Sequence, residues 1–246
     1  MNRISIKIIE LGNTKENINK KKLERYKSDF FKIESFEKIG VLPLQPTSGN
    51  TLDIVYSKNQ ITAVLREREF SGLIVGVMNY RFRDNFYMHR INQNTMVISL
   101  FGIKEILSPA DIDLENFIIR CIYEAVCFYK AWGNSVSDEV YQFVHPDTRG
   151  CLFDLSGDRT DIIYNIEKPI ICDECKGKLR QRPLPEGFLE KFGNELKRID
   201  KPFLMKIELF IRKYPLLSFI IAIFGSIILN ILSSFIEYWL KKNIFH

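Results

Sequence analysis

The chain is poor in the residues that build disulfide frameworks. Its 246 residues include only five cysteines and three histidines, and no N-terminal signal peptide is recognisable. Five cysteines leave one without a partner, so a secreted, disulfide-rich scaffold is disfavoured and an intracellular location is expected. The sequence also lacks internal repeats and low-complexity tracts. This composition favours one soluble domain of ordinary size together with a smaller part.

Charged residues are absent from a run of 22 residues near the C-terminus, from Pro215 to Ile236. At 1.5 Å per residue, a helix of this length crosses the hydrocarbon core of a bilayer, whereas buried helices of soluble proteins seldom run uncharged past about 18 residues. Aromatic residues typical of a membrane interface flank the run. We therefore expect a single transmembrane helix at 214–240, followed by a short tail at 241–246.

Net positive charge is lacking over the first 175 residues, which hold 22 Lys and Arg against 24 Asp and Glu, a net charge of −2. The segment 176–213 holds 11 against 5, a net charge of +6. The basicity therefore lies next to the predicted span, which makes nucleic-acid binding unfavourable and predicts contact with anionic headgroups. It also predicts a cytoplasmic N-terminal domain, although Lys241 and Lys242 partly balance the charge on the far side.

Four of the scarce His and Cys residues form a pattern typical of a zinc site. His145 and Cys151 precede a C-x-x-C pair formed by Cys172 and Cys175. Three thiolates and one imidazole suit a closed tetrahedral site without an open position for a substrate, so we expect a structural zinc ion. A C-x-x-C pair also occurs in redox motifs, but those begin a helix after a strand, whereas here a Pro-Ile-Ile segment precedes the pair and a basic run follows it.

The soluble part combines patterns typical of strands and of helices. Strands are predicted at 4–11, 73–78, 86–91 and 95–100, and helices at 19–31, 58–67 and 114–132.

These elements predict an α+β domain at 1–180 with a mixed sheet, flanking helices and a zinc knuckle at 145–175. Apolar residues at helical spacing then predict a basic amphipathic stalk at 181–213, broken at Pro202. The apolar side of this stalk could face the bilayer or neighbouring copies, and packing on its own domain is favoured.

The predicted order of elements resembles the archaemetzincin branch of the metzincin zinc peptidases over about residues 50–180. The resemblance rests on an apolar strand, a hairpin ending in Met96–Leu100, the long helix and the late C-x-x-C pair. It implies a metzincin-like fold whose long helix carries H-E-x-x-H, with two zinc-binding histidines and a glutamate as general base. This chain has Tyr123-Glu124-Ala125-Val126-Cys127 there, and Gly133 where a third ligand would fall.

The resemblance therefore implies a pseudopeptidase that has lost its catalytic metal. It also implies a retained structural zinc, bound in archaemetzincins by two spaced cysteines and a terminal C-x-x-C pair, with His145 replacing one cysteine here. Glu124 is a weak catalytic candidate, because pairing with Arg120, four residues earlier, or exposure to solvent is the plainer interpretation. Cys121 and Cys127 are expected in the core.

Three functions follow as alternatives. The first is a membrane-tethered, non-catalytic sensor or interaction domain that binds a protein partner or a small ligand. Small and polar residues in the span suit homo-oligomers, and an oligomerising membrane effector of bacterial defence is a sharper version. The second is a membrane-anchored zinc hydrolase with noncanonical ligands. The third is a membrane-tethered nucleic-acid-binding zinc protein, which the charge distribution makes unfavourable.

Overall fold

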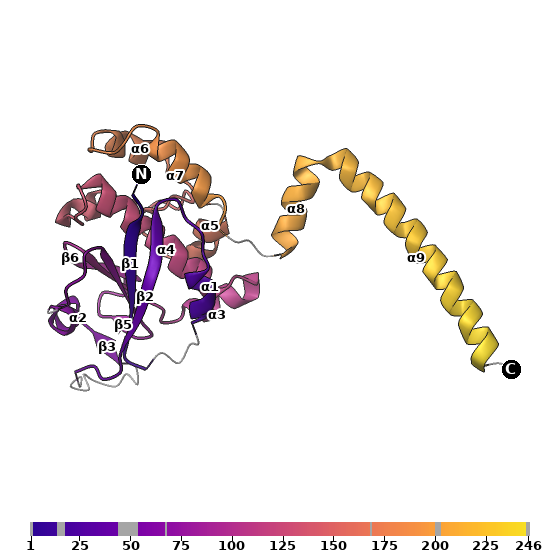
Figure 1. The fold of residues 1–246 in the computed structure, drawn as a ribbon, viewed down its shortest axis with the longest axis horizontal. Coiled ribbons are helices and arrows are strands. Elements are labelled where there is room, and N and C mark those ends of the chain that lie inside the picture. The colour runs from indigo at the N-terminus through magenta and orange to yellow at the C-terminus, as the bar shows by residue number, and fades with distance from the viewer. Residues whose placement is uncertain are drawn as a thin grey trace. The chain divides into compact units, whose positions relative to one another are not determined.

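The structure is a computed structural model with two compact units, Met1–Asp200 and Lys201–His246. The first unit is a mixed α/β domain built on a central sheet, and the described part of the second consists of α8 (Phe203–Lys213) and α9 (Pro215–Ile244) (Figure 1). The residues described are 2–13, 18–43, 54–66, 68–167, 169–199 and 203–244.

The central sheet has five strands in the order β2-β1-β4-β7-β6. Neighbouring strands are parallel except β6, which runs antiparallel to β7 at one edge. The strands are β1 (Ile4–Leu11), β2 (Phe31–Ile39), β4 (Leu73–Met78), β6 (Met88–Asn92) and β7 (Thr95–Ser99). A separate parallel pair joins β3 (Val55–Tyr56) to β5 (Arg81–Phe82).

Helices flank the sheet, so the predicted combination of a mixed sheet with flanking helices is confirmed. Those of the first unit are α1 (Lys20–Glu24), α2 (Lys58–Leu65), α3 (Ile103–Leu107), α4 (Leu114–Ala131), α5 (Asp161–Glu167), α6 (Asp173–Arg180) and α7 (Phe188–Leu196), with short 3-10 helices at Ser108–Ala110 and Asp138–Gln142.

The central strands are apolar on both faces because helices cover both. Alternate residues such as Ile6, Val75 and Ile98 belong to the larger core, which includes most of α4. The residues between them, such as Ile74 and Val97, pack with α2 on the opposite face. Strands buried on both faces appear in the sequence as continuous apolar runs, which explains why β4 was predicted with its correct bounds.

The helix predicted at 19–31 was wrong in extent, and the strand after it was not predicted. α1 ends at Glu24, and Phe31 begins β2. The hydroxyl of Ser28 accepts the backbone N–H groups of Phe30 and Phe31, at 3.0 and 3.3 Å, which offers the backbone a turn in place of a helix.

The compact unit includes α7, which lies within the stalk predicted at 181–213. Phe188, Phe192 and Leu196 of α7 are buried. The two phenylalanine rings meet Phe30 edge-on, with centroids 5.2 and 4.9 Å from its own. The apolar stripe of this helix therefore packs on its own domain, as favoured above.

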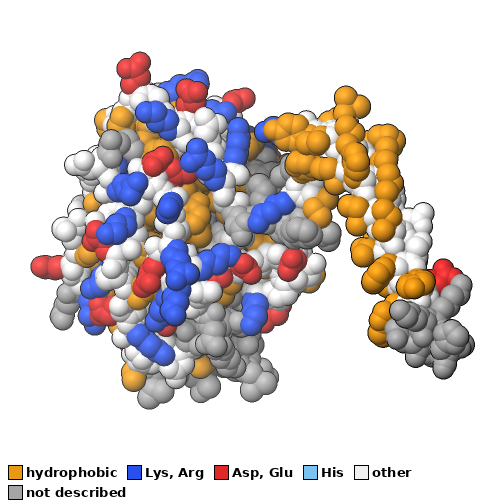
Figure 2. Space-filling view, turned by 45° about the vertical axis from the view of Figure 1, so that its right-hand side comes forward, with side chains coloured by type: hydrophobic (Ala, Val, Ile, Leu, Met, Phe, Trp, Pro, Cys, Tyr) orange, Lys and Arg blue, Asp and Glu red, His pale blue; other side chains and the backbone are white. Residues whose placement is uncertain are grey.

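α9 exposes apolar side chains between Pro215 and Trp239. Pro215–Trp239 is a helical segment of 25 residues with a mean hydropathy of 2.4, and none of its most apolar window is buried. Figure 2 shows hydrophobic side chains covering this helix, whereas charged side chains are spread over the first unit. The segment is long and apolar enough to cross a membrane.

Candidate metal centre

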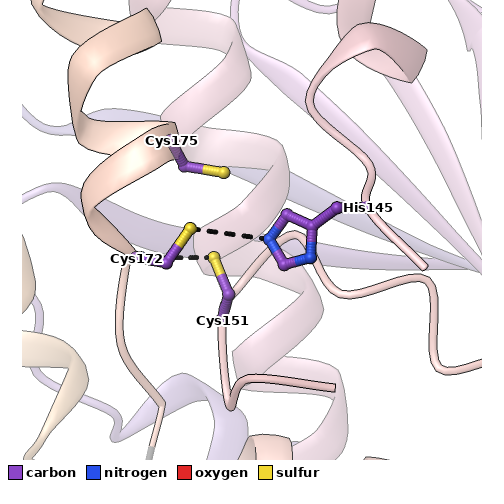
Figure 3. A group of neighbouring side chains, drawn as sticks. All are labelled: His145, Cys151, Cys172 and Cys175. Carbon is purple, nitrogen blue, oxygen red and sulfur yellow. Dashed lines mark hydrogen bonds between the residues drawn. The ribbon is translucent and has the colours of Figure 1, made fainter. Parts of the chain in front are cut away.

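The four predicted zinc ligands come together where a loop meets the start of α6. His145 and Cys151 belong to the loop, Cys172 is the N-cap of α6 and Cys175 lies in its first turn. Their ligand atoms all lie within 4.8 Å of one another (Figure 3). No other group of three or more His, Cys, Asp and Glu side chains in the described part of the chain is close enough together to hold a metal ion.

Backbone contacts hold this loop in place. Cys151 forms an isolated parallel bridge with Ile170, and the N–H of Leu152 donates to the Ile170 carbonyl at 2.7 Å. His145 forms a second isolated bridge with Asp154. The two ligands on this loop therefore have a fixed position opposite the two ligands at the start of α6.

Oxygen atoms near Nδ1 orient the ring of His145. Nδ1 donates to the carbonyl of Asp147 at 3.1 Å and lies 3.1 Å from Oδ1 of Asp154. Nε2 faces Cys172, 3.6 Å from its Sγ. A histidine whose Nδ1–H is held by oxygen presents Nε2 as the ligand, which is the usual arrangement of zinc-bound histidine.

Donors around Cys151 favour its thiolate, the form that binds zinc. The thiol of Cys175 is the first of these, followed by the backbone N–H groups of Cys172 and Phe153. Together with His145 they lower the pKa of Cys151, against the opposing effect of burial. Three thiolates and one imidazole are a common zinc-binding set, so the four residues could bind zinc.

One sequence argument about the C-x-x-C pair was wrong. The pair was set apart from redox motifs because it was not expected to begin a helix, yet Cys172 is the N-cap of α6. The Pro-Ile-Ile segment forms only an isolated bridge before the helix starts. The helix position of the pair therefore does not separate a metal site from a redox-active one.

The residues of α4 that resemble H-E-x-x-H are buried and have different partners. Tyr123 donates to Glu195 of α7 at 2.7 Å, and Cys127 lies in the core. Glu124 pairs with Arg120 at 2.6 Å, as predicted. Burial raises the pKa of Glu124 to about 7, although the nearby guanidinium opposes the rise.

A pocket of about 240 Å³ beside Glu124 was not predicted from the sequence. Aromatic side chains, among them Phe86 and Tyr87, form much of its lining, and Glu124 and Asp154 contribute carboxylates. These residues come from segments far apart in the chain. Because no local motif joins them, no sequence signal could have indicated the pocket.

The backbone beside this pocket is strained. Asn85 and Ser156, which adjoin Phe86 and Leu155 of the lining, have φ angles of 65° and 50°. Residues other than glycine seldom adopt this left-handed conformation, and such strain concentrates at functional sites. Nη2 of Arg159 donates to the carbonyl and side-chain oxygens of Asn85, at 3.0 and 2.8 Å, and ties the two segments together.

Comparison with known proteins yields one structural likeness. No family model and no curated protein match the chain. Among solved structures, the chain is similar to the crystal structure of archaemetzincin from Methanopyrus kandleri. The match has 12% sequence identity and a TM-score of 0.46, and it covers 73% of this chain and 94% of that chain. The loss of catalytic histidines and of catalysis stays a prediction.

Proposed function

We propose that the chain is a membrane-tethered binding domain held together by a structural zinc ion. The convergence of four ligand atoms within 4.8 Å carries this proposal, with three of the four side chains buried. Four protein ligands complete a tetrahedral zinc site and leave no position for a catalytic water. Zinc bound there joins the 145–154 loop to α6 and supports the fold rather than a reaction.

α9 supplies the proposed tether. Its exposed apolar length suits a membrane span, and the net charge of +6 over 176–213 supports a cytoplasmic position for the first unit. The domain then presents its binding surface to the cytoplasm while the helix keeps it at the membrane.

The pocket beside Glu124 is the proposed binding site for a small ligand or a segment of a protein partner. A mainly apolar lining with a few polar groups is typical of such sites. The ion pair between Glu124 and Arg120 holds the carboxylate in place, which supports a binding role over proton transfer.

One observation favours the alternative of a membrane-anchored hydrolase. A pKa of about 7 suits a general base, and Glu124 lines the pocket. This alternative requires a second metal ion or a nucleophile in addition to the four-ligand cluster.

The metal content of the full chain, purified in detergent and measured by mass spectrometry, tests the proposal. We expect one zinc per chain in the wild type and none after the paired substitutions Cys172→Ser and Cys175→Ser. Cys121→Ser is the matched control, because this buried thiol of α4 is outside the cluster, and it should keep one zinc. Two metals per chain, with peptide hydrolysis abolished by Glu124→Ala, would establish the hydrolase instead, and zinc-free wild type would overturn both.

A further inference from the structure

One member of the metal cluster is open to solvent. Cys172 is partly exposed, whereas the other three ligands are buried. It lines a groove of about 430 Å³ whose other residues come from α6, α7 and the segment before α6. Cys172 is therefore the ligand residue that a reagent in this groove reaches first. Cys172 is also the N-cap residue of α6, three residues before Cys175.

A second thiol is placed to complete a disulfide. Cys175 lies three residues further along α6, and its sulfur is within 4.8 Å of that of Cys172. It is buried, so a reagent in solvent reaches it only after Cys172. The pair therefore has an accessible attacking thiol and a protected resolving thiol.

We propose that Cys172 is an oxidation site through which peroxides release the zinc ion. The inference rests on the proposed zinc site. The Cys172 thiolate attacks the peroxide, an S–O bond forms, the O–O bond breaks, and hydroxide leaves. The Cys175 thiolate then attacks the resulting sulfenic acid, an S–S bond forms, and a second hydroxide leaves. The two sulfurs lose two electrons, the peroxide gains them, and Zn²⁺ loses two of its four ligands.

Release has a direct structural consequence. Cys172 and Cys175 are the two ligands on α6, so their loss removes the bond between this helix and the 145–154 loop. α6 is followed by α7, the last helix before the second unit. Oxidation thus loosens the part of the domain that leads to the proposed tether.

The test uses the full zinc-loaded chain in detergent, treated with hydrogen peroxide or tert-butyl hydroperoxide. A chromophoric chelator follows zinc release, and mass spectrometry after thiol blocking maps the disulfides. We expect one zinc released for each Cys172–Cys175 disulfide, and rebinding after reduction in the presence of zinc.

Two glycine substitutions test the route. Gly193 lines the groove, and a Cβ there meets no atom within 4 Å, so Gly193→Leu fills the groove without a clash at its first carbon. It should slow release by tert-butyl hydroperoxide several-fold. Gly177→Leu is the matched control, because Gly177 lies on α6, has the same open space and is outside the groove lining, and the rate should not change.

The outcomes separate this inference from the zinc site itself. Zinc that is bound at the outset but retained under peroxide overturns the inference alone. A disulfide formed by Cys151, or equal release rates in the two leucine variants, does the same. Wild-type protein that carries no zinc before treatment overturns the proposed function.

Discussion

Among single residues, Asp154 supports the metal site without being a ligand. Its Oδ1 lies 3.1 Å from Nδ1 of His145, and its Oδ2 accepts two backbone N–H groups at 2.9 Å. Asp154→Asn removes the charge that favours a proton on Nδ1, so we expect zinc affinity to fall about 10–100-fold, as for other residues that orient a ligand. Competition with a chelator measures this. Asp158→Asn, an exposed residue of the same segment, should bind as the wild type does, and an equal loss in both variants would contradict the role of Asp154.

Titration of Glu124 couples stability to pH. Its pKa is about 7 in the folded chain, against an ordinary value of 4.5. Between these values the unfolded chain has released a proton that the folded chain still holds, so the free energy of unfolding falls as pH rises. We expect this decrease from about pH 5 to 7 in the wild type and its absence in Glu124→Gln. Urea unfolding of the zinc-saturated protein at several pH values measures both slopes, and identical slopes would show that Glu124 ionises at its ordinary pKa.

Among the elements, α7 is fixed by a buried carboxylate as well as by its phenylalanines. Glu195 accepts the hydroxyl of Ser28, the hydroxyl of Tyr123 at 2.7 Å and the backbone N–H of Asp29 at 3.0 Å. Glu195→Ala leaves these donors without their acceptor, and each such buried group costs about 1–3 kcal/mol. We expect a clear loss of stability in urea unfolding and faster proteolysis within 181–199.

The exposed Glu190 of the same helix supplies the control for this prediction. Glu190→Ala should change stability by less than about 0.5 kcal/mol, as is usual for surface substitutions. Equal destabilisation by the two substitutions would contradict the role of the Glu195 network, because alanine favours a helix at least as well as glutamate.

The sequence predicted elements best where the pattern of apolar residues is strong. β1 and β4 were found with their correct bounds, because period-two alternation and an unbroken apolar run are strong signals. β2 was not predicted, because it is an edge strand with charged residues on its exposed side and an irregularity in its pairing after Ile33. Its placement depends on pairing with β1, which no local pattern contains.

The candidate site also has features that the sequence could predict and features that it could not. The four zinc ligands could be predicted, because few residue types bind zinc and the C-x-x-C spacing is restrictive. Their convergence within 4.8 Å needed the fold. The pocket beside Glu124 and the groove beside Cys172 could not be predicted, because each combines side chains from separate segments.

For the whole molecule, α9 and the charge that precedes it predict where the first unit lies. The segment 176–213 carries a net charge of +6, whereas 214–246 holds two Lys against one Glu, a net charge of +1. Because positive segments stay on the cytoplasmic side, protease should digest the first unit in vesicles whose cytoplasmic face points outward. A tag placed after His246 should be protected there and removed in vesicles of the opposite orientation. Digestion of the first unit only in vesicles of the opposite orientation would contradict the predicted topology.

Membrane insertion itself is tested by charges placed along α9. Ile223→Lys combined with Ile227→Lys puts two charges near the middle of the span, where each costs about 3 kcal/mol, and should release the protein on alkaline carbonate extraction. The control pair, Tyr238→Lys and Trp239→Lys, lies at the end of the span, where lysine reaches the headgroups, and should stay in the membrane fraction. If the variant with the central pair also stayed in the membrane fraction, another surface of the chain would bind the membrane, and the span assigned to α9 would be wrong.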